Sequence, residues 1–337
     1  MSDASAFVAG YSGEVHNVGS PRFLTGASKC ESSSSVLAAS RRSHAPRERR
    51  PNVVIPPMGA RTASTSPLSA TSADAVEPPS SLALYDLAVS NFGARVRLVI
   101  YLLEIEHLVQ MRTPTELGGT KSEAYLALNP QGKVPMLVVE RPGQDALPLA
   151  ESEIIVQYLL DVFPDTGPKS LRIANVHTPE LRALARSATR VQDVYLGNLQ
   201  GSLYKAMDAE TRATSIRSLM AQLDLLEILL CRCAKLVGSD SAQDVVFFGG
   251  RQICTADCAL FPSFVFFEFM LPLFSLDPFQ GRRPRLEAWW RALLREGAFE
   301  KVRAQIRTEL DGWQAKGRWA NLGILDQIRD HPQLFKA

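Results

Sequence analysis

Hydrophobic and polar positions follow two different periods along this chain, and the change of period divides it into two parts. Between residues 81 and 164, short apolar runs alternate with stretches in which apolar residues recur every three or four positions. The first pattern is typical of strands and the second of helices. Strands are predicted at 82–87, 107–112, 134–139 and 147–150, and helices at 91–105, 122–128 and 151–163. This order predicts one small α/β domain over residues 81–164.

The helical period takes over after residues 165–176, which are rich in Pro, Asp, Gly and Lys and are predicted to be a linker. Thr178-Pro179-Glu180 is a helix start, because proline is favoured at the first helical position. The helices that follow are predicted at 178–207, 210–237, 253–269, 284–295 and 296–310. An all-helical domain is therefore expected over 177–312. The C-terminal extension, 313–337, is expected to form either an added helix or a loose tail.

The first 80 residues show no apolar periodicity. They contain sixteen serines and an arginine-rich stretch, Arg41 to Arg50, so they are predicted to be a disordered leader. Leaders rich in Ser and Arg and poor in acids are typical of organelle transit peptides, and Ala4-Ser5-Ala6-Phe7 resembles the junction motif of some plastid leaders. A plastid location is then expected, otherwise the cytoplasm or another organelle's matrix. The alternatives are a plain disordered extension and a mis-assigned start codon.

Charge and hydropathy exclude two classes of partner. The formal net charge is +2, and the leader accounts for it, because the remaining residues hold 29 basic and 29 acidic side chains. A neutral globular part has no electrostatic footprint for nucleic acid. The most apolar stretch, residues 264–274, is interrupted by Glu268 and Pro272 and is too short to span a membrane. It is predicted to be a buried helix.

The five cysteines form no spaced framework, and their odd number favours a reducing compartment. Cys254 and Cys258 lie four positions apart and share a helix face, which leaves a metal pair open as an alternative. No histidine lies near them in the sequence, so two core thiols are the favoured interpretation. No metal site is predicted, since the five histidines are scattered as well.

The most informative stretch is the run Asn129 to Pro135 (Asn-Pro-Gln-Gly-Lys-Val-Pro), followed by Glu151-Ser152. The run is a turn that enters a strand at Pro135. If the Val134–Pro135 bond is cis, the backbone N–H and C=O of Val134 are exposed to a ligand. Glu151 and Ser152 open a helix, whose free amides and positive dipole end suit an anionic group. The two pieces are predicted to grip one peptide-like ligand.

These motifs resemble the glutathione transferase family over residues 82–310. The resemblance is carried by the turn 129–135, by the helix opening Glu-Ser-x-Ile-Ile-x-x-Tyr-Leu at 151–159, and by Ala256-Asp257 in a later helix. Lys121-Ser122 and Lys133 are most similar to the plant tau class of soluble, serine-type members. The resemblance implies a thioredoxin-like α/β domain followed by an all-helical domain, a role in detoxification, and a homodimer.

The resemblance also implies how glutathione, the co-substrate, is held. Glu151 and Ser152 hold the γ-glutamyl end, and the Val134 backbone, freed by a cis Pro135, pairs with the cysteinyl main chain. Lys121 and Lys133 reach the glycyl carboxylate, a pairing of opposite charges. Each assignment has a plainer alternative, namely surface lysines, a first-turn serine and an ordinary trans proline at a strand edge.

The resemblance places Ser90 at the catalytic position, where its hydroxyl stabilises the glutathione thiolate. The family often has Ser-Pro-Phe here, but this chain has Ser90-Asn91-Phe92. The alternatives are that Ser90 is only a helix N-cap, or that Tyr85 on the first strand supplies the hydroxyl. No cysteine lies between residues 82 and 163, so thiol–disulfide exchange through a protein thiol is expected to be very weak.

A hydrophobic small molecule is the expected second substrate. Its pocket is predicted between the two domains near Phe92, Tyr195 and Leu199, although Tyr195 and Leu199 also fit an inter-helix core. The predicted function is conjugation of glutathione to hydrophobic electrophiles or glutathione-dependent reduction of organic peroxides. The alternative is a non-catalytic module with the same fold that binds glutathione or hydrophobic ligands.

Overall fold

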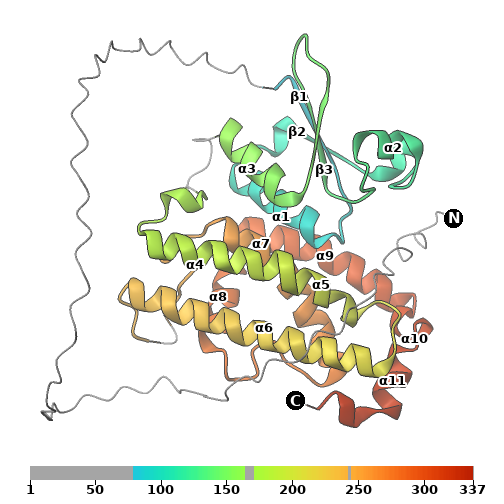
Figure 1. Ribbon diagram of the computed structural model, residues 1–337, viewed down its shortest axis with the longest axis vertical. Helices are drawn as coiled ribbons and strands as arrows, with labels where there is room; N and C mark the ends of the chain where they lie inside the picture. Colours follow the sequence, from blue (N-terminus) through green and yellow to red (C-terminus); the bar gives the residue numbers. More distant parts are fainter. Residues whose placement is uncertain (1–78, 164–170, 242–243, 337) are drawn as a thin grey trace, which may run out of the picture. The chain divides into compact units, whose positions relative to one another are not determined.

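A computed structural model of the chain describes residues 79–163, 171–241 and 244–336 (Figure 1). All of the described residues belong to one compact unit, Val76–Ala337. Most of the predicted leader and the first part of the predicted linker lie outside the described residues. The disordered leader, the transit peptide and the linker therefore stay predictions.

The α/β part is built on one four-stranded sheet with the order β2-β1-β3-β4. β1 pairs with β2 in parallel and with β3 in antiparallel orientation, and β4 continues the sheet antiparallel to β3. The parallel pair requires a crossover, which is the helix α1. The strands are β1 (Ser81–Tyr85), β2 (Val109–Arg112), β3 (Met136–Glu140) and β4 (Leu147–Ala150).

Side chains alternate between the two faces of the sheet, as the pleat requires. Leu82 and Leu84 of β1 face the main core, which they share with α1 (Asn91–Leu102) and α3 (Ser152–Val162). Tyr85 lies in a smaller cluster with Tyr125 of α2 (Glu123–Leu128) and Met136. Figure 1 shows α2 on the opposite side of the strands from α1 and α3.

The helical part follows with longer elements. The single helix predicted over 178–207 is instead a run of four segments, in which α-helix passes through a π-helical and then a 3₁₀ stretch. They are α4 (Pro179–Arg190), the π-helix η5 (Val191–Leu196), α5 (Gly197–Leu199) and the 3₁₀-helix η6 (Gln200–Leu203). The later helices are α6 (Ala209–Leu236), α7 (Thr255–Met270), α8 (Pro284–Leu293), α9 (Gly297–Ala315), α10 (Arg318–Asn321) and α11 (Ile324–Asp330).

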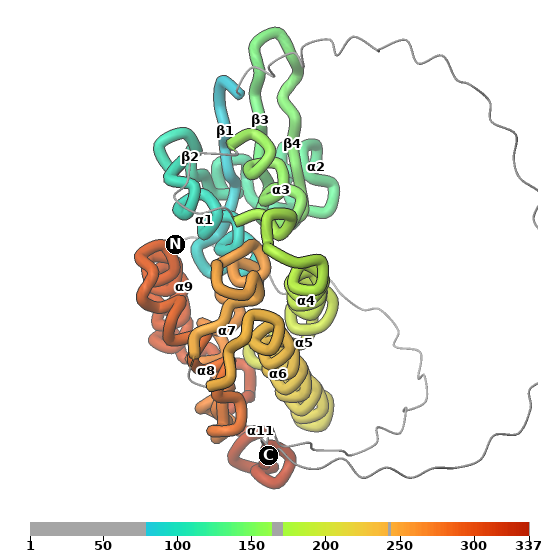
Figure 2. Tube along the Cα trace, turned by 90° about the vertical axis from the view of Figure 1, so that its left-hand side faces the viewer, coloured from blue at the N-terminus to red at the C-terminus, as the bar shows by residue number. Residues whose placement is uncertain are grey.

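The most apolar helix, α7, lies at the centre of this part. Figure 2 shows it between α9 on one side and α4 to α6 on the other, and it also packs against α1. The stretch Thr255–Phe274 is long and apolar enough to cross a membrane, but 78% of its most apolar window is buried inside the structure. This burial fits the core helix that the sequence predicts. The core therefore runs continuously from the sheet face through α1 into the helical part.

The C-terminal extension forms short helices rather than a loose tail as far as residue 336. The indole of Trp319 donates to the carbonyl of Leu203, and Gln327 bonds both Arg212 and the carbonyl of Met207. Arg212 is itself fully buried. The extension is thus fixed both to the end of the helical run 179–203 and to the start of α6.

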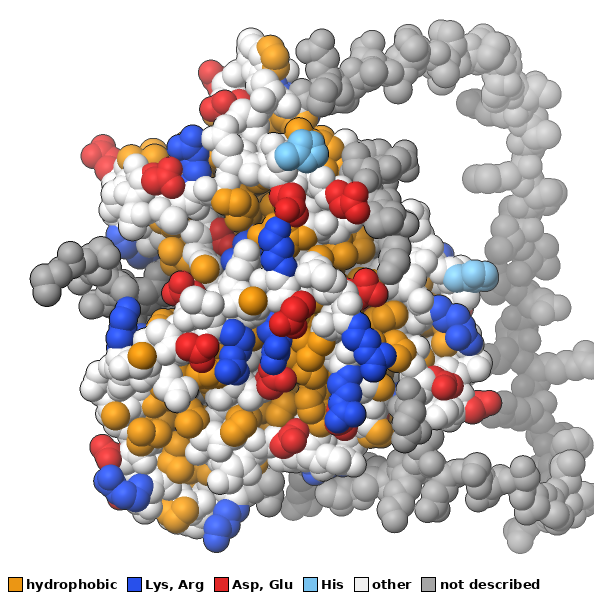
Figure 3. Space-filling view, turned by 180° about the vertical axis from the view of Figure 1, so that it is seen from behind, with side chains coloured by type: hydrophobic (Ala, Val, Ile, Leu, Met, Phe, Trp, Pro, Cys, Tyr) orange, Lys and Arg blue, Asp and Glu red, His pale blue; other side chains and the backbone are white. Residues whose placement is uncertain are grey.

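Acidic and basic side chains are interspersed on the face of the molecule in Figure 3. Elsewhere among the described residues, ion pairs join opposite charges, including Arg303 of α9 with Glu268 of α7 at 3.1 Å. Another joins Lys301 to Glu106 at 2.8 Å. On this face the balanced charge of the sequence is therefore also a locally balanced surface.

Asp257 ties the start of α7 to the rest of the helical part. Its carboxylate is fully buried and accepts hydrogen bonds from the amides of Cys254 and Phe248, at 2.8 and 3.1 Å, and from the Trp289 indole at 2.8 Å. Burial raises the pKa of this carboxyl, and the three donors oppose the rise. Cys254 is the N-cap residue, and its thiol and that of Cys258 are free and buried. Among the described residues, no group of three or more His, Cys, Asp and Glu could hold a metal.

Replacing Asp257 with alanine is expected to lower the free energy of unfolding by about 3 kcal/mol or more, because each unsatisfied buried donor costs about 1–3 kcal/mol. Urea denaturation measures the loss. Asp311→Ala is a matched control, since its carboxylate is 60% exposed and lies 3.6 Å from Arg307. An exposed pair of this kind contributes about 0–1 kcal/mol. Equal losses in the two variants would contradict the role given to Asp257.

Candidate functional site

The sheet register brings three separate segments to one end of the sheet. Tyr85, the last residue of β1, pairs with Met136, the first residue of β3. Met136 in turn pairs with Ala150, the last residue of β4. The chain therefore leaves β1 toward Ser90, enters β3 from Pro135 and leaves β4 at Glu151, all at the same end. Residues that lie far apart in the sequence become neighbours for this reason.

The turn before β3 is held from inside by Asn129 and Tyr125. The Asn129 amide and the Tyr125 hydroxyl both donate to the carbonyl of Lys133, at 2.9 and 2.7 Å. Asn129 is 3% exposed, and burial raises the pKa of Tyr125 to about 12, so its hydroxyl stays protonated as a donor. The Val134–Pro135 bond is cis, and Val134 lies outside the strand ladder, which begins at Met136. The sequence did not single out Asn129 and Tyr125 as the residues that shape this turn.

The two lysines predicted to reach a carboxylate both lie on the surface beside this turn. Lys121 Nζ donates to the carbonyl of Gly132 at 3.4 Å, so its ammonium group lies against the turn itself. Gly132 has φ +59°, and a side chain there would meet the carbonyl of Thr120 at 2.7 Å. Lys133 is exposed on the same turn. The turn thus carries cationic groups next to the strand entry.

The start of α3 lies at the same end of the sheet and is the second part of the candidate site. Glu151 has φ +68°, a backbone conformation that is strained for a residue with a side chain and that clusters at ligand-binding positions. Ser152 is the first residue of α3 and is 5% exposed. The first amides of a helix have no partner within the helix and attract negative charge. The start of α3 is therefore suited to binding a carboxylate.

A buried arginine that the sequence patterns did not reveal holds the start of α3 in place. Arg95 of α1 is 1% exposed, and its guanidinium pairs with Glu153 and with Asp193, the latter at 3.1 Å. The same group donates to the Ser152 hydroxyl at 3.4 Å. Arg95 therefore joins α1, the start of α3 and the π-helix of the helical part. Its signal in the sequence is a charged residue between two apolar residues, Ala94 and Val96, inside a helix.

Ser90 is the N-cap residue of α1. Its hydroxyl oxygen accepts from the Gly93 amide at 3.0 Å, and its backbone is extended, with φ −71° and ψ 119°. A hydroxyl that accepts through a lone pair still has its own proton to donate. Among the described residues, this is the hydrogen bond that the Ser90 side chain makes. The N-cap role and a role as donor to a ligand are therefore compatible.

The competing hydroxyl, Tyr85, lies in the small core on the α2 face of the sheet. It is 8% exposed, and its ring meets that of Tyr125 edge to face with the centroids 6.4 Å apart. The structure thus places Ser90 at a helix start and Tyr85 within packed aromatic side chains. The Ser90 hydroxyl is therefore better placed to reach a ligand than the Tyr85 hydroxyl.

Directly behind the start of α1 lies a buried carboxyl group that the sequence reading also missed. Asp86 is 5% exposed, and its Oδ2 lies 3.2 Å from Nε of Arg97. A side chain at Gly93 would stand 1.7 Å from Oδ1 of Asp86, so glycine is required at that position. Burial raises the pKa of Asp86 from 3.8 to about 7, and the charge of Arg97 opposes the rise only in part.

Phe92 lies against the helical segment that carries Tyr195 and Leu199, the other two residues predicted for the electrophile pocket. A Cβ atom on Gly197 would stand 3.0 Å from Cζ of Phe92, so the ring lies against the helical segment between the other two residues. Tyr195 is 51% exposed and therefore is not a core residue, whereas Leu199 is half-buried against the core. The core alternative thus applies to Leu199 in part and not to Tyr195.

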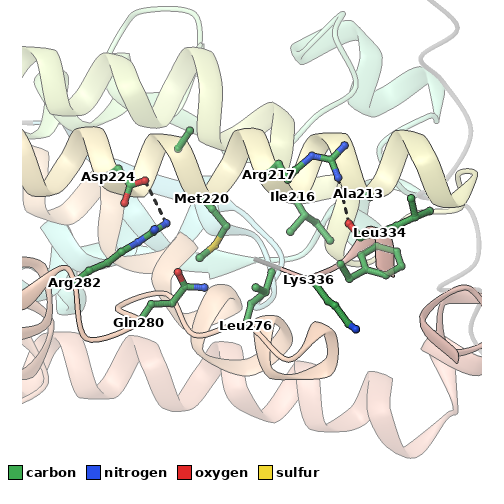
Figure 4. A pocket seen from close by; sticks show the side chains of 12 residues that line it. Ala213, Ile216, Arg217, Met220, Asp224, Leu276, Gln280, Arg282, Leu334 and Lys336 are labelled. Carbon is green, nitrogen blue, oxygen red and sulfur yellow. Dashed lines mark hydrogen bonds and ion pairs between the residues drawn. The ribbon is translucent and has the colours of Figure 1, made fainter. Parts of the chain in front are cut away.

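A separate pocket of about 210 Å³ lies between α6, the loop 276–282 and the C-terminal residues (Figure 4). Ile216, Met220 and Leu276 form its apolar part, and Arg217 and Asp224 lie at its edge. None of the site residues described above lines it. It is a different region of the molecule from the candidate site.

A four-stranded mixed sheet with a cis-proline turn, joined to an all-helical part, is the thioredoxin-like fold class that the sequence predicts. Comparison with known proteins agrees. The family profile described as "Glutathione S-transferase, N-terminal domain" matches residues 84–168. The probable glutathione S-transferase GSTU6 of Oryza sativa subsp. japonica is 30% identical over 205 residues, which cover 59% of this chain and 78% of the relative. The glutathione S-transferase GstB of Escherichia coli K12 is 29% identical over 220 residues, covering 63% and 94%.

Among solved structures, rice GST1 (OsGSTU1) in complex with glutathione has 27% identity and a TM-score of 0.54, and the match covers 70% of this chain and 97% of that one. The chain belongs to the glutathione S-transferase family. The family, its likeness to tau-class members, the fold class and the enzyme class predicted from the sequence are confirmed. The roles of the individual site residues stay predictions.

The carboxyl of Asp86 is expected to make stability depend on pH. Its pKa is about 7 in the folded protein and 3.8 ordinarily, so the folded state binds the proton more tightly between these values. The stability that the protonated group contributes is complete below the lower value and is lost as pH rises toward the upper one. Asp86→Asn does not titrate. Its free energy of unfolding should therefore rise relative to wild type between about pH 5 and about pH 8.

Urea denaturation at the two pH values measures this difference. Asp145→Asn, at an exposed carboxylate in the turn between β3 and β4, is the matched control and should show no such trend. A difference between Asp86→Asn and wild type that shrinks or stays constant as pH rises would contradict the buried, proton-binding state of Asp86.

Proposed function

We propose that this protein conjugates glutathione to hydrophobic electrophiles or reduces organic peroxides with it, and that Ser90 stabilises the thiolate. One observation carries the proposal. The Ser90 hydroxyl opens α1 at the sheet end that also holds the cis Pro135 and the start of α3, and among the described residues it accepts from the Gly93 amide and has no acceptor for its own proton. Groups that can bind a peptide-like anion and a hydroxyl that can donate to it thus lie at the same end of the sheet.

Each end of glutathione has a chemically matched partner in this arrangement. The γ-glutamyl carboxylate suits the first amides of α3 and the Ser152 hydroxyl, and its ammonium group suits Glu151. The cysteinyl main chain suits the backbone of Val134, which lies outside the ladder. The glycyl carboxylate suits Lys121 and Lys133 at the turn. In this arrangement the cysteinyl sulfur is expected between these groups, at the sheet end where Ser90 opens α1.

General values show by how much Ser90 can lower the pKa of the glutathione thiol. A free thiol has a pKa of about 8.5. A hydrogen bond to a charged group contributes about 1.5–3 kcal/mol, which lowers that pKa by about one to two units. The helix N-terminus adds about 0.3–1 kcal/mol. Together they bring the thiol to a pKa near or below 7, so that the nucleophilic thiolate is abundant at neutral pH.

The thiolate then reacts directly with the second substrate. In conjugation, its sulfur forms a bond to an electrophilic carbon, and the leaving group departs with the bonding electrons. In peroxide reduction, the sulfur attacks one peroxide oxygen, the O–O bond breaks, and the alkoxide leaves and takes up a proton to become the alcohol. The oxygen stays on the sulfur as glutathione sulfenic acid, which a second glutathione thiol attacks to give glutathione disulfide and water. Phe92, Tyr195 and Leu199 offer an apolar surface to the body of a hydrophobic substrate. Without a cysteine between residues 82 and 163, exchange through a protein thiol has no nucleophile there.

Ser90→Ala is expected to lower the conjugation rate with a generic aromatic electrophile by about 10- to 100-fold, because the hydrogen bond to the thiolate is lost. Retention on glutathione resin should persist, since the grip on the peptide is elsewhere. Ser90→Thr keeps a hydroxyl and should retain most activity.

The matched control is Thr178→Ala. Thr178 caps α4 by accepting from the Leu181 amide at 3.2 Å, so this variant loses an equivalent N-cap away from the site. Equal activity in Ser90→Ala and wild type would overturn the role of Ser90 and direct attention to Tyr85. Wild-type retention on the resin without conjugation or peroxidase turnover would instead favour a non-catalytic binding module.

A further inference from the structure

A buried polar network lies where the start of α1 meets the helical part. The Asn91 amide group donates to Oε1 of Gln200 at 3.2 Å and to Oγ of Ser263 at 3.3 Å. The Gln192 amide group donates to the same Ser263 oxygen at 2.8 Å. Gln192 and Gln200 are 1% exposed, and Ser263 is fully buried. Four polar side chains, three of them buried, thus meet where the first turn of α1 packs on the helical part.

The place of Asn91 makes this network more than an internal contact. Asn91 is the first residue of α1 and directly follows Ser90. Its two partners belong to the 3₁₀-helix η6 and the core helix α7, and Gln192 of the π-helix η5 joins the network through Ser263. The hydroxyl of Ser90 caps the same helix turn through Gly93. Any shift of Asn91 relative to the helical part would therefore carry Ser90 with it.

Burying this network carries a free-energy cost, because its polar groups lose their contact with water. Buried polar groups destabilise a fold unless they are hydrogen-bonded, and Oε1 of Gln192 has no partner among the described residues. Side-chain networks of this kind do, however, impose one geometry on a core that apolar packing alone would define less sharply. A proline at this position, usual in the family, would set the helix start through its own backbone ring. Asparagine instead sets it through side-chain bonds to the helical part.

Two neighbouring residues of the π-helix are connected to different parts of the candidate site. Gln192 reaches Asn91 through their shared acceptor, Ser263, and the adjacent Asp193 pairs with Arg95, which holds Ser152. π-Helical segments occur frequently at functional sites. This one lies in the same run as Tyr195 and Leu199. The segment beside the expected electrophile is therefore in contact with both the peptide grip and the helix start.

We propose that Asn91 is a positioning residue, which holds Ser90 in place against the glutathione sulfur by fastening the first turn of α1 to Ser263 and Gln200. This inference rests on the proposed function, in which Ser90 donates to the thiolate. A hydrogen bond to a charged atom weakens steeply with distance and angle, so even a small displacement of Ser90 changes the pKa of the bound thiol. Asn91 acts through Ser90 and needs no contact with the substrate.

The test is the pKa of the glutathione thiol in the binary complex, followed by the ultraviolet absorbance of the thiolate as pH is varied. Asn91→Ala is expected to raise this pKa by about half a unit to one unit and to lower kcat/KM by about tenfold. The dissociation constant of glutathione should change by less than about twofold, because binding relies on other groups. Ser263→Ala removes the shared acceptor and leaves Asn91 in place, so it should raise the thiol pKa in the same direction.

Gln305→Ala is the matched control. Gln305 of α9 also fastens α1 to the helical part, accepting from Arg97 at 2.9 Å and donating to the Tyr101 hydroxyl at 3.0 Å. Both contacts lie beyond the first turn of α1. This variant should lower stability without changing the thiol pKa, which separates positioning of Ser90 from a general loss of packing.

The outcomes are distinguishable. A raised thiol pKa in Asn91→Ala and in Ser263→Ala, together with an unchanged value in Gln305→Ala, supports the inference. An unchanged pKa in folded Asn91→Ala or folded Ser263→Ala overturns it and leaves the proposed function intact, provided that the wild-type thiol pKa is depressed. A wild-type bound thiol with the pKa of free glutathione overturns the proposed function and this inference together.

Discussion

The buried guanidinium of Arg95 is the constraint on which the site depends most. A charge that is 1% exposed must be paired, and its partners Glu153 and Asp193 come from α3 and from the π-helix of the helical part. α1 can dock only where both carboxylates and the Ser152 hydroxyl meet this group. Removing the guanidinium would leave partly buried carboxylates without compensation, which is more destabilising than the intact set is stabilising. One side chain thus fixes the relative positions of the helix that carries Ser90 and the helix that opens with Ser152.

The sheet register supplies the second constraint. Because Tyr85, Met136 and Ala150 are aligned across three strands, the segments bearing Ser90, Pro135 and Glu151 leave the sheet together. A slip of one residue would turn the apolar side chains of β3 from one face to the other, so the register is strongly specified by burial. The Asn129 and Tyr125 bonds to the Lys133 carbonyl then set the turn that enters β3. Backbone pairing brings the pieces together, and buried polar side chains orient them.

The sequence predicted the elements and motifs better than the contacts between them. The strand 147–150 was placed correctly, and the helix starts at Asn91 and Pro179 follow from local capping signals. The helix predicted over 178–207 contains π-helical and 3₁₀ stretches, and nothing in its apolar period marks them. Their side chains Gln192, Asp193 and Gln200 instead bond residues of α1 and α7 that lie far away in the sequence. Arg95, Asp86 and Asn91 were missed as interacting groups for the same reason, since local patterns carry no information about distant partners.

The central claim is that one end of the sheet both holds glutathione and activates its sulfur. A crystal structure of the protein with bound glutathione tests it most directly. The account predicts the sulfur within about 3.5 Å of the Ser90 hydroxyl oxygen. It also predicts the cysteinyl main chain beside Val134 and the γ-glutamyl carboxylate at the start of α3. A sulfur that lies away from Ser90, or beside the Tyr85 hydroxyl, would contradict it.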